Sequence, residues 1–374
     1  MFEPIMIPAH LLPSDGRFGS GPSKVRGPQL DALMATQPTL LGTSHRQAPV
    51  KDLVGDVRSM LATLFDVPDG YEVMLGNGGS TMFWDAAAFG LVENKAQHGA
   101  FGEFGQKFAK ATLAAPYLEA SSIRTAQPGA VILPTAEEGV DVYAWPHNET
   151  STGAMVEVLR PAEIGDALTV VDGTSAAGGL YLDTRQADVY YFAPQKSFAS
   201  DGGIWFALVS PAAIERIERI AASGRYIPES LSLQAALTNS RVNQTLNTPA
   251  VATLVLMRAQ LEWMLAGGGM DFVTNRTSQS ARIIYEWADS RAWAEAFVTE
   301  PSNRSNVVGT IGLVDTVDSS HLRQHLRANG VVDVDPYRKL GLNQIRVGMF
   351  PAVDPEDVSA LTHSIDYLVE RLLT

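Results

Sequence analysis

The sequence contains no cysteine, which excludes disulfide bonds, thiolate metal sites and catalysis by a thiol. Positive charge is also scarce, because 28 Lys and Arg residues stand against 41 Asp and Glu residues, for a net charge of −13. No block of basic residues stands out, so neither nucleic acid nor an anionic membrane surface is an expected partner. The seven histidines are scattered without the spacing of metal ligands, so no metal is expected.

Long apolar runs are missing as well. The longest, residues 250–257, is far shorter than the ~20 residues that a membrane span needs. The first 19 residues lack the basic and apolar regions of a signal peptide, and Pro and Asp interrupt them. We therefore expect a cytoplasmic protein without a membrane segment. Its length of 374 residues, with 45% hydrophobic and 18% charged residues, is typical of a globular enzyme with two domains.

Predicted strands and helices alternate through residues 49–265. Apolar runs predict strands at 71–75, 141–145, 168–171, 188–193 and 204–209, and helical spacing predicts helices at 49–65, 82–92, 106–115, 211–223 and 250–265. This alternation predicts an α/β fold with a mostly parallel sheet. After the glycines at 267–269, helices at 272–288, 319–328 and 355–372 and strands near 307–314 and 344–349 predict a small α+β unit.

Lysine is rare, and one lysine has an unusual position. The lysines are Lys24, Lys51, Lys95, Lys107, Lys110, Lys196 and Lys339. Only Lys196 follows directly on a strand as apolar and aromatic as 188–193, and Asp172 ends the strand at 168–171. Ligands of parallel sheets bind outside the carboxyl ends of the strands, so both side chains are expected to point into one crevice.

The chemistry of this pair has two interpretations. Burial lowers the pKa of a lysine and makes its amine a nucleophile for carbonyls. A carboxylate on the adjacent strand could pair with the ring nitrogen of pyridoxal phosphate. A structural ion pair between Asp172 and Lys196 at the sheet edge is the alternative, and these two residues alone do not decide between them.

Two segments are candidate anion sites. Residues 76–81, GNGGST, lie between a predicted strand and a predicted helix, where backbone N–H groups and the helix dipole bind phosphate. A tight turn that only packs the strand against the helix is the alternative. Asn247 and Thr248 precede the helix predicted at 250–265, with Thr248 as its N-cap and Pro249 as its first residue. That pair is either an anion site or a plain cap.

Several motifs in one order resemble the class V aminotransferases of fold type I. They are the glycine loop, Asn148-Glu149-Thr150, Asp172-Gly173-Thr174-Ser175, Gln195-Lys196 and Asn247-Thr248-Pro249. Three further features, Gly19-Ser20-Gly21-Pro22, Ser44-His45-Arg46 and Arg346, make the chain similar to the phosphoserine aminotransferase family, in its actinobacterial branch. The resemblance covers essentially the whole chain. It implies a large domain at residues 20–265, with a mostly parallel seven-stranded sheet flanked by helices, and a small α+β domain from residues 1–19 and 266–374.

The resemblance also implies an activity. The enzyme would use pyridoxal 5′-phosphate to interconvert 3-phosphoserine and 2-oxoglutarate with 3-phosphohydroxypyruvate and glutamate, in serine biosynthesis. A phosphorylated hydroxythreonine on the pyridoxine route is a second candidate substrate. Another class V enzyme, such as an alanine– or serine–glyoxylate aminotransferase, is one alternative. A non-catalytic regulator that binds a metabolite is another.

Site residues follow from the same resemblance. Lys196 would bind the cofactor covalently, Asp172 would pair with the ring nitrogen, Thr150 would hydrogen-bond the ring oxygen and Phe104 would stack on the ring. The cofactor phosphate would be held by Gly79, Ser80, Thr81 and Gln195, and by Asn247 and Thr248 of the partner subunit in a homodimer with shared active sites. The substrate would be bound by His45, Arg46, Arg338 and Arg346. Phe104 and Ser80 stand where many relatives have Trp and Arg, and Arg338 does not align with the His-Arg pair of other branches.

Overall fold

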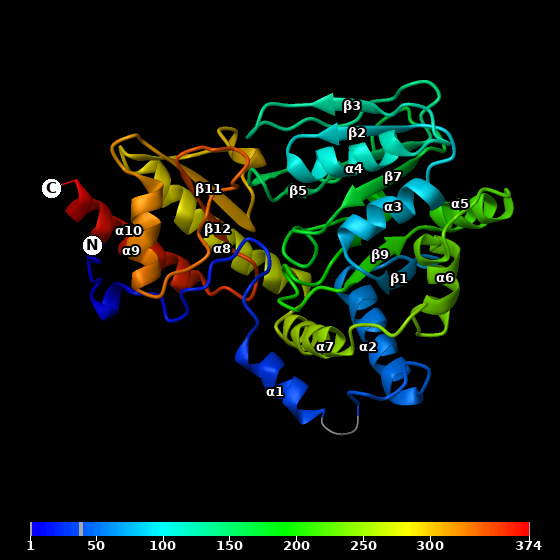
Figure 1. Ribbon diagram of the computed structural model, residues 1–374, viewed down its shortest axis with the longest axis horizontal. Helices are drawn as coiled ribbons and strands as arrows, with labels where there is room; N and C mark the ends of the chain where they lie inside the picture. The colour runs from blue at the N-terminus through cyan, green and yellow to red at the C-terminus, as the bar shows by residue number, and fades with distance from the viewer. Residues whose placement is uncertain (1, 37–39, 374) are drawn as a thin grey trace.

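The structure is a computed structural model that describes residues 2–36 and 40–373. Its largest sheet has seven strands in the order β1-β9-β8-β7-β4-β2-β3 (Figure 1). Their bounds are β1 Glu72–Asn77, β9 Ile204–Val209, β8 Val189–Phe192, β7 Leu168–Asp172, β4 Val142–Pro146, β2 Ala96–Ala100 and β3 Ser122–Thr125. Strands β3, β2, β4, β7 and β8 pair in parallel, and β9 runs antiparallel to both β8 and β1. The predicted mostly parallel α/β fold is confirmed.

Helices cover both faces of this sheet. On one face lie α1 (Gly27–Ala35), α2 (Ala48–Leu64) and α7 (Val251–Ala266), and on the other lie α3 (Ser80–Gly90), α4 (Glu103–Ala114), α5 (Pro211–Ala222) and α6 (Leu233–Arg241). Strand β8 shows why two layers are needed. Tyr190 and Phe192 pack with α2 and α7, whereas Val189 and Tyr191 pack with α3, α5 and α6, as alternation along a strand requires.

A second sheet forms the core of a separate unit. It has the order β10-β11-β12, with bounds Ala294–Ala296, Val308–Leu313 and Gln344–Gly348. Around it pack α8 (Met270–Asp289), α9 (Ser319–Ala328) and α10 (Pro355–Leu372). The N-terminal segment (blue in Figure 1) joins this unit, because Ile7 and Phe18 lie in the same apolar cluster and Gly348 N donates to the carbonyl of Phe18 (2.8 Å). The division at residues 19/20 and 265/266 stays a prediction.

The remaining regular elements are short. They are the strands β5 (Asn148–Glu149) and β6 (Ala154–Met155) and the 3₁₀ helices Ala9–Leu11, Thr184–Gln186, Glu229–Leu231 and Pro301–Asn303. Among residues 2–36 and 40–373, no helix combines the length and the hydrophobicity of a membrane span.

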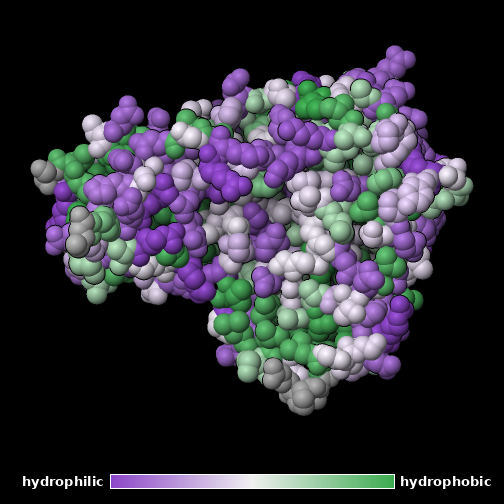
Figure 2. Space-filling model, in the orientation of Figure 1, coloured by the Kyte–Doolittle hydropathy of each residue, from purple (hydrophilic) through white to green (hydrophobic). Residues whose placement is uncertain are grey.

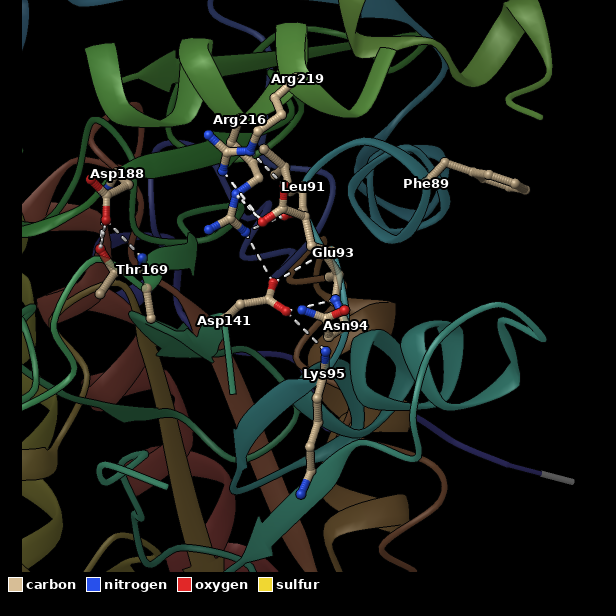
Figure 3. A network of polar contacts seen from close by, with 12 residues as sticks. Phe89, Leu91, Glu93, Asn94, Lys95, Asp141, Thr169, Asp188, Arg216 and Arg219 are labelled. Carbon is tan, nitrogen blue, oxygen red and sulfur yellow. Dashed lines mark hydrogen bonds and ion pairs between the residues drawn. The ribbon is translucent and has the colours of Figure 1, made fainter. Parts of the chain in front are cut away.

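A charged network holds the amino ends of the central strands (Figure 3). Asp141, just before β4, accepts hydrogen bonds from the backbone N–H groups of Glu93, Asn94 and Lys95, just before β2. Arg216 of α5 donates to Asp141 (3.0 Å) and pairs with Glu93 (3.2 Å). These charged side chains pair with one another, and they lie at the end of the sheet opposite to Asp172. The network is therefore structural, and a ligand site is expected at the carboxyl ends of the parallel strands.

Candidate active site

Lys196 lies in the turn after β8 and is buried under the N-terminal segment. Its Nζ donates to the carbonyl oxygen of Ser20 (2.7 Å), and Ser23 N donates to the carbonyl of Gln195 (2.8 Å). Gly21 passes so close that a Cβ there would lie 2.3 Å from Nζ, and its φ of +150° also favours glycine. The glycine at this position therefore makes room for the lysine.

Asp172 ends β7 and is also buried. Its Oδ1 accepts a hydrogen bond from the backbone N–H of Thr174 (2.8 Å). Tyr191 is its register partner on β8 and hydrogen-bonds the carboxylate. The indole of Trp84 in α3 in turn donates to the Tyr191 hydroxyl (2.8 Å), which leaves the phenol hydrogen for Asp172. A chain of donors thus runs from α3 through β8 to the carboxylate.

The glycine loop forms the third side of the site. Strand β1 ends at Asn77, Gly78 has a φ of +104°, Gly79 is the N-cap and α3 begins at Ser80. The Ser80 hydroxyl lies 2.7 Å from the hydroxyl of Thr174, which connects the loop to the segment after Asp172. The free N–H groups at the start of α3 are thereby held beside Asp172, where they can bind an anion.

These three features enclose a cavity of about 520 Å³, within the range of small-molecule sites. Of the predicted site residues, it is lined by Gly79, Ser80, Thr81, Phe104, Thr150, Asp172, Gln195 and Lys196. Phe104, at the start of α4, places its ring centroid 6.0 Å from Lys196 Nζ. Arg346 of β12 reaches the rim, where it donates to the carbonyl of Thr150 (2.8 Å). Both sheets therefore contribute to one site.

Electrostatics in the cavity favour a neutral amine. The pKa of Lys196 is lowered to about 7, first by burial and then by the Arg346 guanidinium, against the opposing charges of Asp172 and Glu149. Burial raises the pKa of Asp172, and its hydrogen bonds from Thr174 and Tyr191 and the charge of Lys196 act to lower it. Lys196 donates to a carbonyl, and it forms no ion pair with Asp172 in the part of the chain that the structure describes. The interpretation as a structural ion pair is therefore not supported.

Comparison with known proteins agrees with this geometry. The family model described as aminotransferase class-V matches residues 111–335. A phosphoserine aminotransferase of Nocardioides sp. is 58% identical over 374 residues, which is 100% of each chain. The chain belongs to the class V aminotransferases. The resemblance to the phosphoserine aminotransferase family, deduced from the motifs, is confirmed, as is the expected enzyme class.

Solved structures establish the fold type of this aminotransferase. A phosphoserine aminotransferase from Cytophaga hutchinsonii superposes with a TM-score of 0.86 at 22% identity, over 94% of this chain and 99% of that one. One from Bacillus circulans subsp. alkalophilus superposes with a TM-score of 0.82 at 19% identity, over 96% and 99% of the two chains. The expected fold-type-I architecture is confirmed.

Some predicted site residues lie outside the cavity of their own chain. His45 Nδ1 is 3.2 Å from the Thr248 hydroxyl, Arg46 donates to Gln244 (3.3 Å) and Asn247 N donates to Asn77 (3.2 Å). These residues form a second, mostly exposed group beside β1. The predicted cap at Thr248 is wrong, because α7 begins at Val251 with Ala250 as its N-cap. Thr248 instead accepts a hydrogen bond from the Asn77 side chain at its carbonyl oxygen (3.0 Å), and the helix begins two residues after Pro249.

Arg338, the fourth predicted substrate residue, is exposed in the loop before β12 and lines no part of the cavity. Its neighbour Tyr337 packs against Phe104 with ring centroids 6.2 Å apart, and the Arg346 guanidinium lies 5.4 Å from the Tyr337 ring. In this segment the residue that contacts the cavity wall, through Phe104, is thus Tyr337, to which the sequence assigned no role.

Six further residues line the cavity without having been assigned a role from the sequence: Gly21, Pro22, Trp84, Asn148, Thr174 and Ser175. Five of them belong to motifs that carried the family resemblance, so the signal was present. Trp84 belongs to none of these motifs. Its position is decided by the helical phase of α3, which turns the indole toward Tyr191.

Proposed function

We propose that this aminotransferase transfers the amino group between 3-phosphoserine and 2-oxoglutarate, giving 3-phosphohydroxypyruvate and glutamate, as a step of serine biosynthesis. The observation that carries the proposal is one cavity that combines a buried amine of lowered pKa, a buried carboxylate and a helix N-terminus. The 58% identical relative bears the name of this activity over its whole length.

The residues present fit pyridoxal 5′-phosphate. The buried Oδ1 of Asn148 and Oε1 of Gln195 lack a hydrogen-bond partner among the described residues, although both side chains line the cavity. Buried polar groups are normally paired, so a polar ligand is expected there. Lys196 would bind the aldehyde carbon, Asp172 the ring nitrogen and Thr150 the ring oxygen. Gly79, Ser80, Thr81 and Gln195 would surround the phosphate.

When bound, the cofactor withdraws electrons from the α-carbon of the amino acid and so makes its proton removable. Asp172 would keep the ring nitrogen protonated through its negative charge, which the donors Thr174 and Tyr191 support. Nζ of Lys196, with a pKa near 7, is largely neutral in mildly alkaline solution and removes and returns the proton of the α-carbon. Phe104, which lines the cavity, would cover one face of the ring and exclude water.

Arginines give the site its preference for anionic substrates. Arg346 is half-buried at the rim, and its Nε has no hydrogen-bond partner among the described residues, which suits a substrate carboxylate. We assign Arg46 to a second carboxylate, and His45 and Arg338 to the substrate phosphate. Since His45, Arg46, Asn247 and Thr248 lie outside the cavity of their own chain, we assign them to the site of the partner subunit.

A homodimer with shared active sites is therefore part of the proposal. Apolar surface gathers in the lower part of Figure 2, where Figure 1 places α1, α2 and α7. Leu30 and Met34 on α1 are 50% and 66% exposed within this patch, and a contiguous apolar patch is where a partner can bind. A cytoplasmic location remains a prediction from the sequence.

One assay tests the reaction. Purified protein with pyridoxal phosphate is mixed with phosphoserine and 2-oxoglutarate, and glutamate is measured. We expect glutamate to form. A protein that produced glutamate only from alanine or serine, or glycine from glyoxylate, would instead be one of the other class V enzymes. Phosphohydroxythreonine as the donor tests the second substrate.

A further inference from the structure

The N-terminus of α4 is capped by a residue from another segment. The N-cap position is occupied by Gly102, which has no side chain to accept the free N–H groups of the first turn. Phe104 N and Gly105 N instead donate to Oε2 of Glu149, at 3.1 Å each. Glu149 ends β5, 45 positions along the chain from Phe104.

The second carboxylate oxygen of Glu149 is also fully used. Oε1 accepts hydrogen bonds from Ser151 N (3.1 Å) and from the Ser151 hydroxyl (2.7 Å). The Ser151 hydroxyl accepts in turn from Glu103 N (3.1 Å), the first N–H group of α4. The Glu149 side chain is completely buried, so one carboxylate and one hydroxyl satisfy the first turn of the helix away from water.

Gly102 leaves the space that the Glu149 side chain occupies. A Cβ at residue 102 would lie 2.2 Å from Cγ of Glu149 and 2.5 Å from Cδ, so only glycine leaves room for the carboxylate. The backbone of Gly102 is extended, with a φ of 177°, and other residues adopt this conformation without strain. The glycine is therefore required for space and not for its conformational freedom.

We propose that Glu149 is a positioning residue that caps α4 from β5 and thereby fixes the Phe104 ring over the Lys196 cavity. Phe104 is the second residue of α4, and Glu149 holds its backbone N–H directly. Asn148 and Thr150, which flank Glu149, both line the same cavity. One buried carboxylate thus ties together the aromatic face and the polar edge of the site. The role of Phe104 against a cofactor ring rests on the proposed function.

A negative charge suits this position. Burial raises the pKa of the Glu149 carboxyl, while hydrogen bonds from Ser151 and Gly105 act to lower it. The N-terminus of a helix also carries partial positive charge, which favours the ionised carboxylate. The negative charge of that carboxylate acts to raise the pKa of Lys196 and of Arg346. A test must therefore separate the cap from the charge.

The test compares Glu149→Ala with the double variant Glu149→Ala/Gly102→Ser. Alanine leaves the N–H groups of Phe104 and Gly105 without an acceptor. Serine at residue 102 supplies an acceptor from the ordinary cap position without restoring charge. Of the three atoms nearest to a Cβ there, Glu149→Ala removes two and leaves the Ser151 hydroxyl oxygen, which a change of side-chain rotamer can move. The control is Glu103→Gln, which removes a neighbouring charge that pairs with Lys339 and caps nothing.

The measurement is the affinity of the cofactor-free protein for pyridoxal phosphate, together with the visible circular dichroism of the bound cofactor. We expect Glu149→Ala to bind about tenfold more weakly, with a reduced dichroic band, because the energy of a helix cap corresponds to a factor of this size. The double variant is expected to regain most of both signals, and Glu103→Gln is expected to match the wild-type protein.

Wild-type affinity in Glu149→Ala would overturn the inference, and so would a folded double variant that recovers neither signal. If Glu149→Ala does not fold, Glu149→Gln replaces it. The glutamine keeps the size but turns an NH₂ group toward donors, so binding several-fold weaker than wild type is expected and unchanged binding would contradict the cap. If the wild-type protein binds no pyridoxal phosphate, the proposed function fails, and recovery of the unfolding midpoint by Gly102→Ser still decides whether Glu149 is the cap.

Discussion

Replacing Lys196 by methionine is expected to abolish transamination and, in the cofactor-free protein, to stabilise the fold. The amine is buried beside Arg346, and its pKa falls from 10.5 to about 7. That lowering measures how much the folded protein disfavours the ammonium relative to water. Methionine has a similar length and carries no charge, so it removes the cost while filling the space.

The magnitude follows from the pKa and depends on pH. One pKa unit corresponds to about 1.4 kcal/mol, so at pH 6, where the amine is charged in both states, the variant should gain about 5 kcal/mol. Above pH 7 the folded amine loses its proton while the unfolded chain keeps it up to about 10.5. The unfolded state then binds more protons, so the stability of the wild-type protein rises with pH. At pH 9 the advantage of the variant should shrink to about 2 kcal/mol.

Urea unfolding of the two cofactor-free proteins at pH 6 and pH 9, followed by circular dichroism, measures the difference. Lys24 supplies a matched control, because it is equally buried at 8% exposure but forms ion pairs with Asp357 (3.4 Å) and Asp15 (3.5 Å). Lys24→Met should therefore destabilise the protein, since it leaves buried charge unpaired. The reasoning is refuted if Lys196→Met lowers the stability at pH 6, or if its effect is the same at both pH values.

Three further substitutions separate substrate binding, cofactor binding and stability. Arg46→Ala is expected to weaken phosphoserine binding by about tenfold or more while the affinity for pyridoxal phosphate stays nearly constant; equal losses in the two titrations would argue against its assignment. Tyr191→Phe removes a donor that lowers the pKa of Asp172, so the variant's carboxylate should be protonated at a higher pH. As the pH is lowered, cofactor affinity should therefore be lost at a higher pH than in the wild-type protein, and an identical profile would contradict the chain of donors from Trp84. Arg216→Met leaves Asp141 without its cation, whereas Glu93 keeps its pair with Arg219, and it should lower the free energy of unfolding by about 3–5 kcal/mol in urea, with kcat unchanged; a fall in kcat at full stability would show that the network is not merely structural.

The central part of the sheet could be predicted because its strands are apolar on both faces. Strands β7, β8 and β9 are buried at every position and consist mainly of Val, Ile, Tyr and Phe, so hydrophobicity alone marked them. The helices α5, α9 and α10 were predicted within about a residue of their bounds, because each has an amphipathic pattern with a Ser, Asp or Pro at its start.

Strand β2 was missed although it is entirely buried. Its sequence, AQHGA, is polar, and its burial depends on partners far along the chain. Gln97 bonds to Glu137 (2.6 Å) and Thr135 N donates to Gln97 (2.8 Å), while the His98 ring lies 2.7 Å from the Thr112 hydroxyl. No local sequence pattern indicates the hydrogen bonds that satisfy these buried polar side chains. The false cap at Thr248 has the same origin, since Asn77, which forms hydrogen bonds with the backbone of Asn247 and Thr248, is remote in sequence.

The sequence by itself determined the fold class, the family and those residues of the Lys196 cavity that belong to the family motifs. These depend on local patterns in a recognisable order. The tertiary structure alone decided which side chains converge. It brought Ser20 and Gly21 over Lys196, turned Trp84 toward Tyr191 and buried Glu149 against the first turn of α4. It also left His45 and Arg46 outside the cavity of their own chain. Burial and pKa are properties of the surrounding atoms, and those atoms come from segments that only folding places side by side.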